Sequence, residues 1–319
     1  MHSLAIIQHN IPLADKNWFK TGGTAQWYAD PRTAAEFADA LVYAYAHNLP
    51  VTVLGEGANI LISDAGISGL VIRPALKDIF FEKITDAILV TAQAGVSMSD
   101  LIEQCLHEAA LGLEEFSGIP GTVGGSVFIN IHYFEFLLSN FLVEATVINA
   151  QTGDIKKVNH DWLHFGYNYS TLHEKEYYLF DATFRLKRAE SDLEVAYARG
   201  RRKEIIRHRT ARYPNARTCG SFFRNFFPEE VTLESQGKKL IYVAYYLDKI
   251  GVKGALSCGG ATVSYQHANM LVNTGTATSA DIITLARTMQ QKVYDAYGII
   301  PQPECRLLGF SDYPLLIKK

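Results

Sequence analysis

Ser117-Gly118-Ile119-Pro120-Gly121-Thr122-Val123-Gly124-Gly125-Ser126 places four glycines within eight residues, beside a proline and a threonine. Glycine lets backbone amides approach a phosphate without a Cβ clash, and consecutive N–H groups form a nest for an anion. A shorter loop, Leu54-Gly55-Glu56-Gly57-Ala58-Asn59, lies upstream between two apolar stretches. An ordinary turn explains either loop alone, whereas two such loops in one chain favour a long dinucleotide as the ligand.

The first glycine loop, 54–59, fits neither of the common phosphate-binding motifs. Its glycines lack the G-x-G-x-x-G spacing, no helix follows directly, and no Gly-Lys-Ser/Thr follows. The pattern of apolar residues around both loops mixes helices and strands, which predicts an α+β fold. The expected helices are 30–47 (capped at Asp30-Pro31), 97–110 (capped by Ser97), 196–212 and 279–297; the expected strands are 51–54, 60–62, 70–72, 87–91, 143–149, 178–186 and the alternating stretches 219–227 and 261–273.

The 319-residue chain has the composition of a globular protein, with 48% hydrophobic and 20% charged residues. This length predicts about two or three domains. Thirty Lys and Arg against 33 Asp and Glu give a net charge of −3, which provides no basic field for nucleic acid or an anionic membrane. No apolar stretch approaches the roughly 18 residues of a membrane span, and residues 1–10 do not resemble a signal peptide. We therefore expect a cytoplasmic protein.

The chain has four cysteines, Cys105, Cys219, Cys258 and Cys305, and none of them forms a Cys-x-x-Cys pair. A disulfide scaffold is not expected at this length and density, and no metal-binding cluster is visible. Buried free thiols are the simplest interpretation.

Two further segments carry residues suited to chemistry. In Cys219-Gly220-Ser221-Phe222-Phe223-Arg224-Asn225, the serine could act as a nucleophile or a proton donor, although a polar turn is the simpler explanation. In Pro303-Glu304-Cys305-Arg306-Leu307-Leu308-Gly309, Glu304 and Arg306 would share one face of a strand. That pair could orient a substrate or form a surface salt bridge.

A basic run is the last feature of this kind. It comprises Arg199, Arg201, Arg202, Lys203, Arg207, Arg209, Arg212 and Arg217. A solvated helix face is the first interpretation, and a site for a diphosphate is the second. Nucleic acid is the third, because few aromatic residues lie nearby and the whole chain is acidic.

These segments occur in an order that resembles the UDP-N-acetylenolpyruvoylglucosamine reductase family, from about Asn17 to Gly309. The matching pieces are Asn17-Trp18-Phe19-Lys20-Thr21-Gly22-Gly23, the first glycine loop, 118–125, Gly220-Ser221-Phe222-Phe223-Arg224-Asn225, 259–264, 267–269, 272–275 and 303–309. The resemblance implies an α+β FAD-binding fold of the vanillyl-alcohol-oxidase (PCMH) type with a third α+β substrate-binding domain. It assigns 1–69 and 70–190 to two FAD-binding subdomains, to which 300–319 return, and 196–299 to the UDP-sugar.

The resemblance also implies the reaction and its residues. FAD would take hydride from NADPH and reduce the enolpyruvyl ether of UDP-N-acetylglucosamine, with Ser221 as general acid and Glu304 as the polarising carboxylate. Tyr167, Arg224, Asn225 and His267 would bind the substrate. The implied FAD contacts are Gly55, Glu56, Gly57, Ala58, Asn59, Ile60, Gly118, Ile119, Pro120, Gly121, Thr122, Gly124, Gly125, Ser126 and Arg306.

The chain departs from the family pattern at two places. Asn168 stands where the family has an arginine of the catalytic site, and losing that cation beside a developing enolate would cost roughly 3 kcal/mol, about a hundredfold in rate. Bulky residues in Asn130-Ile131-His132-Tyr133-Phe134 replace a small turn near the flavin. Two alternatives to a working reductase therefore stay open: a divergent flavoprotein with another substrate, and a non-catalytic binder of flavin or nucleotide sugar. We expect a monomer or a weak homodimer.

Overall fold

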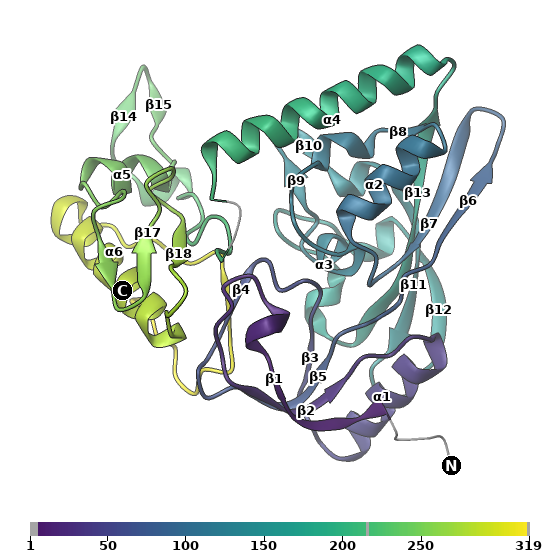
Figure 1. The fold of residues 1–319 in the computed structure, drawn as a ribbon, viewed down its shortest axis with the longest axis horizontal. Helices are drawn as coiled ribbons and strands as arrows, with labels where there is room; N and C mark the ends of the chain where they lie inside the picture. The colour runs from purple at the N-terminus through teal and green to yellow at the C-terminus, as the bar shows by residue number, and fades with distance from the viewer. Residues whose placement is uncertain (1–5, 215–216, 318–319) are drawn as a thin grey trace. The chain divides into compact units, whose positions relative to one another are not determined.

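The computed structural model describes residues 6–214 and 217–317 (Figure 1). Contacts within the chain divide the described residues into two units. The first unit takes them from 1–10, 26–56 and 68–209, and the second from 11–25, 57–67 and 210–319. Each unit is thus assembled from segments far apart in the sequence. The three functional domains expected from the resemblance are a division by ligand and stay a prediction.

The main sheet of the first unit has the strand order β12-β11-β13-β7-β6, and β8 also pairs with β13. Its strands are β6 (Ile79–Lys83), β7 (Ala87–Gln93), β8 (Ala110–Leu111), β11 (Leu142–Asn149), β12 (Ile155–Asn159) and β13 (Tyr177–Arg188). All pairs are antiparallel, and the register places Ala182 of β13 between Ala145 of β11 and Ala92 of β7. β13 is therefore the central strand.

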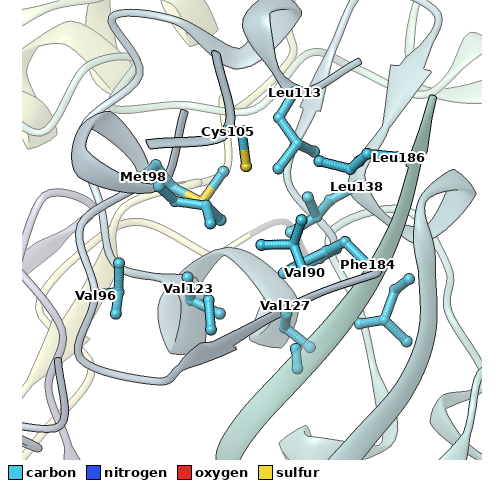
Figure 2. Packing of buried hydrophobic residues seen from close by; sticks show 14 of the residues in the cluster. Val90, Val96, Met98, Cys105, Leu113, Val123, Val127, Leu138, Phe184 and Leu186 are labelled. Atoms are coloured by element: carbon cyan, nitrogen blue, oxygen red, sulfur yellow. The ribbon is translucent and has the colours of Figure 1, made fainter. Parts of the chain in front are cut away.

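Two helices pack against this sheet, α2 (Met98–His107) and α3 (Val123–Phe128). Figure 2 shows Val90 and Phe184 of the sheet beside Met98 of α2 and Val127 of α3, all fully buried. Burying one such side chain stabilises the fold by about 1.5–3 kcal/mol. The expected cap of α2 is confirmed, because the Ser97 side chain accepts a hydrogen bond from the N–H of Asp100.

A second sheet has the order β1-β2-β5-β3, with β1 (Gln8–Pro12), β2 (Thr24–Ala29), β3 (Val51–Val53) and β5 (Ile67–Ile72). Helix α1 (Ala34–Ala46) buries Phe37 and Leu41 in the core of the first unit. The expected cap at Asp30-Pro31 is wrong: α1 begins after Thr33, whose side chain accepts from the N–H of Glu36. A threonine hydroxyl with an acidic residue three positions later satisfies the first turn.

The second unit contains the sheet β16-β17-β18, the pairs β14-β15 and β19-β4, and two helices. The strands are β4 (Ile60–Ile62), β14 (Glu234–Ser235), β15 (Lys238–Lys239), β16 (Ser257–Cys258), β17 (Ala261–Val263), β18 (Leu271–Asn273) and β19 (Arg306–Leu308); the helices are α5 (Val243–Lys249) and α6 (Ser279–Tyr297). Helix α6 matches its predicted bounds. Thr278 and Asp281 form a capping box at its start, and Gly298 (φ +70°) ends it.

Segments from the first part of the chain are built into this unit. Strand β4 pairs in parallel with β19, so that Ile60 lies opposite Arg306. The Asp64 carboxylate accepts hydrogen bonds from the first two N–H groups of α6, those of Ser279 and Ala280, at 2.9 Å each. A carboxylate at this end of a helix is favoured by the helix dipole.

The stretch 219–227 is not a regular strand, contrary to its alternating pattern. Two isolated antiparallel bridges hold it instead, Ser221 with Met270 and Phe223 with Pro303. Likewise, β19 begins only at Arg306, so Glu304 precedes the strand on which it was expected. The predicted basic helix is α4 (Asp192–Arg212), which begins four residues earlier than expected.

None of the helices in the described ranges has the length and apolar character needed to cross a membrane. Among the same residues, no group of three or more His, Cys, Asp or Glu side chains is arranged to hold a metal ion.

Candidate active site

The first glycine loop follows β3 and contacts the second within the first unit. A Cβ atom on Gly55 would lie 2.5 Å from Oγ1 of Thr122, so only glycine allows this approach. The Glu56 carboxylate accepts a hydrogen bond from the N–H of Gly121. Burial raises the pKa of this carboxyl, and the hydrogen bond and nearby cations partly oppose that effect. The structure therefore joins the two loops that the sequence paired only by composition.

The rest of the first loop belongs to the second unit. Gly57 is buried at φ +68°, and a Cβ there would lie 2.6 Å from Cα of Asn17. Ala58 and Asn59 are half-buried, and the carbonyl of Asn59 accepts from the N–H of Arg306 at 3.1 Å. Burial lowers the pKa of the Arg306 guanidinium, which places its charge in a partly desolvated position.

The second glycine loop, 117–126, uses its glycines for left-handed backbone. Gly118 has φ +74° and Gly121 has φ +149°, and the residues between them, Ile119 and Pro120, are half-buried. A side chain at either glycine would strain the backbone.

The loop leads into α3, where its polar groups are largely accounted for. The Thr122 side chain caps α3 by accepting from the N–H of Gly125 at 3.2 Å. Gly124 lies against the turn that follows β7, because its N–H donates to the carbonyl of Ala94 at 2.9 Å. The Ser126 hydroxyl is different: within the described ranges it is a buried oxygen without a hydrogen-bond partner. A buried hydroxyl in this condition requires an explanation.

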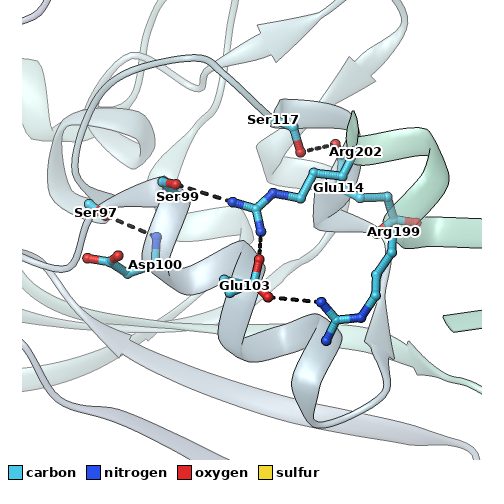
Figure 3. Close-up of polar contacts among 8 residues, drawn as sticks. All are labelled: Ser97, Ser99, Asp100, Glu103, Glu114, Ser117, Arg199 and Arg202. Carbon is cyan, nitrogen blue, oxygen red and sulfur yellow. Dashed lines mark hydrogen bonds and ion pairs between the residues drawn. The ribbon is translucent and has the colours of Figure 1, made fainter. Parts of the chain in front are cut away.

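Several arginines of the basic run lie on helix α4 and pair with carboxylates of the first unit. Figure 3 shows Arg199 and Arg202 on the Glu103 side chain of α2, and Arg201 makes a two-pronged contact with Glu115 at 2.8 and 2.9 Å. An ion-paired helix face therefore accounts for these three arginines. Arg209 differs, because its Nε donates to the carbonyl of Gly118 at 3.0 Å.

Tyr167 and Asn168 form the centre of a tight turn. The N–H of Gly166 donates to the carbonyl of Tyr169 at 3.1 Å, and the reverse bond is 3.4 Å. Asn168 has φ +53°, a left-handed conformation that asparagine tolerates better than most residues. The local backbone therefore favours an asparagine at this position. Tyr167 is exposed and lies 5.3 Å, ring to ring, from His132.

The segments that carry Ser221 and Glu304 lie side by side in the second unit. The carbonyl of Phe222 accepts from the N–H of Glu304 at 2.8 Å and from that of Cys305 at 3.2 Å. Ser221 and Glu304 are both half-buried. The structure thus brings together the segments that carry the two expected catalytic residues, although 82 residues separate Ser221 from Glu304 in the sequence.

The side chains of Arg224 and Asn225 bind other residues of the second unit. The Arg224 guanidinium forms a two-pronged ion pair with Glu230 at 2.7 and 2.9 Å and lies 4.2 Å from the ring centroid of Phe227. The Asn225 side-chain oxygen accepts from the N–H of Val243 at 3.3 Å.

His267 contacts Asn269, a structural residue that is not among the predicted site residues. Burial and neighbouring cations lower the pKa of His267, and its Nδ1 accepts from the N–H of Asn269 at 3.2 Å. The buried Asn269 side chain accepts from the N–H of Phe223 at 3.0 Å and donates to its carbonyl at 2.7 Å. Asn269 therefore fixes the backbone two residues from Ser221, and the only sequence signal for it is its place in the His267-Ala268-Asn269 piece.

The bulky replacement at 131–134 is accommodated in the first unit. Ile131 enters the core, His132 packs against Tyr167, and Tyr133 lies against Phe134. Phe134 itself is 73% exposed. The aromatic residues here thus pack mainly within their own unit.

Two models of known protein families match different parts of the chain. The sequence-family model of an FAD-binding domain matches residues 25–159. A model of the C-terminal domain of UDP-N-acetylenolpyruvoylglucosamine reductase matches residues 212–308. Together with the mixed helices and strands described above, these matches confirm the expected α+β flavoprotein fold.

Relatives of known name match nearly the whole chain. The UDP-N-acetylenolpyruvoylglucosamine reductase of Synechococcus is 33% identical over 310 residues, which cover 97% of this chain and 94% of that protein. The reductase of Listeria monocytogenes is 32% identical over 304 residues, covering 95% of each. The crystal structure of the reductase (MurB) from Thermus caldophilus has the same fold, with a TM-score of 0.75, 24% identity and coverage of 95% and 99%. This chain therefore belongs to the UDP-N-acetylenolpyruvoylglucosamine reductase family.

Proposed function

We propose that the protein reduces the enolpyruvyl ether of UDP-N-acetylglucosamine to UDP-N-acetylmuramate, a step of peptidoglycan precursor synthesis, with NADPH as reductant and FAD as cofactor. Family membership over 97% of the chain supports the activity. The structural observation that carries the proposal is the pairing of the Ser221 and Glu304 segments through the carbonyl of Phe222. That pairing holds side by side the segments that carry this hydroxyl and this carboxylate.

The two glycine loops fit the cofactor. Gly55 allows the two loops to approach closely, Gly121 allows left-handed backbone, and the Ser126 hydroxyl needs a polar partner. A flavin dinucleotide presents pyrophosphate and ribityl oxygens that suit such amides and such a hydroxyl. We assign to FAD the residues predicted from the sequence, from Gly55 to Ile60, from Gly118 to Ser126, and Arg306.

When bound, FAD supplies hydride transfer from NADPH to C3 of the enolpyruvyl group. The protein manages the charge and the proton. Enolate-like negative charge develops on C2 and the carboxylate of the substrate, and preorganised donors lower the energy of that state. We assign to Ser221 delivery of the proton to C2, which requires an approach to about 3 Å. We assign to Glu304 the polarisation of the enolpyruvyl group.

We propose that Tyr167, Arg224, Asn225 and His267 bind the UDP-sugar. The Glu230 contact orients the guanidinium of Arg224, and an arginine has five N–H donors, so this pair does not exhaust its capacity for a diphosphate. Burial lowers the pKa of His267, which favours a neutral imidazole able to exchange hydrogen bonds without adding charge.

A nucleotide-sugar substrate and a nicotinamide reductant support a cytoplasmic place of action. We retain the assignment of 1–69, 70–190 with 300–319, and 196–299 to two flavin subdomains and a sugar-binding domain. We also retain a monomer or weak homodimer, which sedimentation at two concentrations would test.

The test follows the flavin absorption of the purified protein without oxygen. NADPH should bleach the flavin, and UDP-N-acetylglucosamine enolpyruvate should restore its colour. Persistent bleaching after substrate would overturn the proposed function and favour a divergent flavoprotein, the second candidate motivated by Asn168. A colourless preparation that takes up no added FAD would leave only a binding role without flavin.

A further inference from the structure

The hairpin formed by β9 (His132–Tyr133) and β10 (Phe136–Leu137) occupies the position of the small turn expected near the flavin. Its strands pair antiparallel, with Tyr133 opposite Phe136 and His132 opposite Leu137. Adjacent residues of a strand point to opposite faces. His132 and Tyr133 therefore contact different parts of the first unit.

One face supports the Tyr167–Asn168 turn. The His132 ring lies 5.3 Å from the Tyr167 ring and is inclined to it by 43°. The buried Asn130, just before the hairpin, donates to the carbonyl of Gly166 at 3.3 Å and accepts from the N–H of Ser139 at 3.1 Å. The turn is thus attached to the hairpin by a ring contact and a hydrogen bond.

The other face reaches the second glycine loop through one arginine. The guanidinium carbon of Arg209 lies 6.0 Å from the ring centroid of Tyr133, and its Nε donates to the carbonyl of Gly118. Gly118 is left-handed, and a Cβ there would lie 3.2 Å from Cδ of Arg209. The arginine therefore packs directly on the glycine and fixes the direction of its carbonyl.

We propose that β9 is a two-sided positioning strand, in which His132 holds the Tyr167–Asn168 turn for the sugar substrate and Tyr133, through Arg209, holds the Gly118 backbone for the flavin. This inference rests on the proposed function. A misplacement of about 1 Å at a site can cost a hundredfold in rate. A strand that contacts both loops fixes them with one element, and its two faces can be tested separately.

The test compares His132→Leu and Tyr133→Leu, with Glu135→Gln as the control at an exposed position between the two strands of the same hairpin. Tyr133→Leu should weaken FAD binding to the apoprotein about tenfold, measured by flavin fluorescence, and change the KM for UDP-N-acetylglucosamine enolpyruvate less than twofold once FAD saturates. His132→Leu should raise that KM about tenfold without changing kcat or the Kd for FAD by more than twofold. Glu135→Gln should change none of these values.

Arg209→Gln should reproduce the Tyr133→Leu loss of FAD affinity, whereas Tyr133→Phe, which keeps the ring, should retain wild-type affinity. If a leucine variant does not fold, Arg209→Gln tests the flavin face and His132→Asn the substrate face, with the same expected changes. The inference would be overturned if the His132 and Tyr133 variants changed the KM for substrate and the Kd for FAD equally. It would also be overturned if neither variant changed either constant. A wild-type protein that binds no FAD would instead overturn the proposed function.

Discussion

A Cβ atom on Gly55 would lie 2.5 Å from Oγ1 of Thr122, the atom that caps α3. The two glycine loops are therefore in direct contact at these two residues, and moving either residue away would break a hydrogen bond. Moving Thr122 would break its hydrogen bond with the N–H of Gly125. Moving Gly55 would disturb the hydrogen bond from the Arg73 side chain to its carbonyl.

Gly55→Ala should therefore weaken FAD binding at least about tenfold, equivalent to about 1.4 kcal/mol. The added methyl group forces one loop away from the other, and we expect an apoprotein destabilised by about 1–3 kcal/mol. Isothermal titration with FAD and urea unfolding measure the two effects. Gly200→Ala in α4 is the control, because an added Cβ would meet no atom within 4 Å apart from the adjacent backbone of its own helix, and alanine there should stabilise the helix by about 0.5–1 kcal/mol. Unchanged FAD affinity in Gly55→Ala would contradict the contact.

Ser126→Ala should affect stability and flavin binding in opposite directions. Removing a buried hydroxyl without a partner should stabilise the apoprotein by about 1 kcal/mol, and removing a flavin contact should lower FAD affinity. Ser170→Ala is the matched comparison: its hydroxyl donates to the carbonyl of Phe128 at 2.8 Å, so its loss should destabilise the protein by about 1 kcal/mol or more. A less stable Ser126→Ala apoprotein with normal FAD affinity would argue against the assignment.

Glu56→Gln should stabilise the apoprotein relative to wild type more at neutral pH than at acidic pH. Burial raises the pKa of Glu56 in the folded state above its ordinary value of 4.5. Between pH 4.5 and that raised pKa, the folded state therefore binds more protons than the unfolded state. The contribution of this group to stability therefore falls as pH rises through that window. The melting temperature of the Gln variant relative to wild type should be higher at pH 8 than at pH 5 in the apoprotein. A difference that does not depend on pH would contradict this sign.

Asn168→Arg should destabilise the protein by about 1–2 kcal/mol, because arginine would have to adopt the left-handed backbone at φ +53°. Asn168→Gly is the control and should keep the wild-type stability within about 0.5 kcal/mol. Urea unfolding of both variants gives the comparison. Turnover on the UDP-enolpyruvyl compound should not increase in the Arg variant; a clear gain would point to a divergent enzyme that has lost its carboxylate partner.

Ser221→Ala should separate the two half-reactions. Loss of a general acid costs typically 10²–10⁴ in rate, so reoxidation of the flavin by substrate should slow by about that factor. Flavin reduction by NADPH should change less than twofold, and stopped-flow absorption records both steps. Ser235→Ala, in the exposed strand β14, should leave both rates unchanged. Equal slowing of the two half-reactions would remove Ser221 from the role of proton donor.

The sequence predicts best those elements whose ends carry local signals. The bounds predicted for helix α6, 279–297, match the structure, in which Thr278, Asp281 and Gly298 determine its ends. The parallel pairing of β4 with β19 has no local sequence signal, because the two strands are far apart in the sequence and meet only in the folded chain. The stretch 219–227 alternates like a strand, but the Asn269 side chain takes both hydrogen-bonding groups of Phe223.

The candidate site shows the same limit. Glycine content identifies both loops, because their left-handed backbone requires that residue. The contact of Glu56 with Gly121 depends on tertiary structure, and so does the pairing of Arg201 with Glu115, 86 positions earlier. The sequence therefore supplied the chemistry of the site, and the fold supplied its geometry.

The composition of the second unit has a consequence for how the protein is made. Residues 11–25 and 57–67 leave the ribosome early, yet their partners in 210–319 are synthesised last. Phe19 and Leu61, fully buried in that unit, must wait for nearly the whole chain before they are covered. Translation should therefore pass through a long interval in which these apolar segments are available to chaperones. A fragment beginning at residue 210 would lack them altogether, so it should not fold when it is expressed alone.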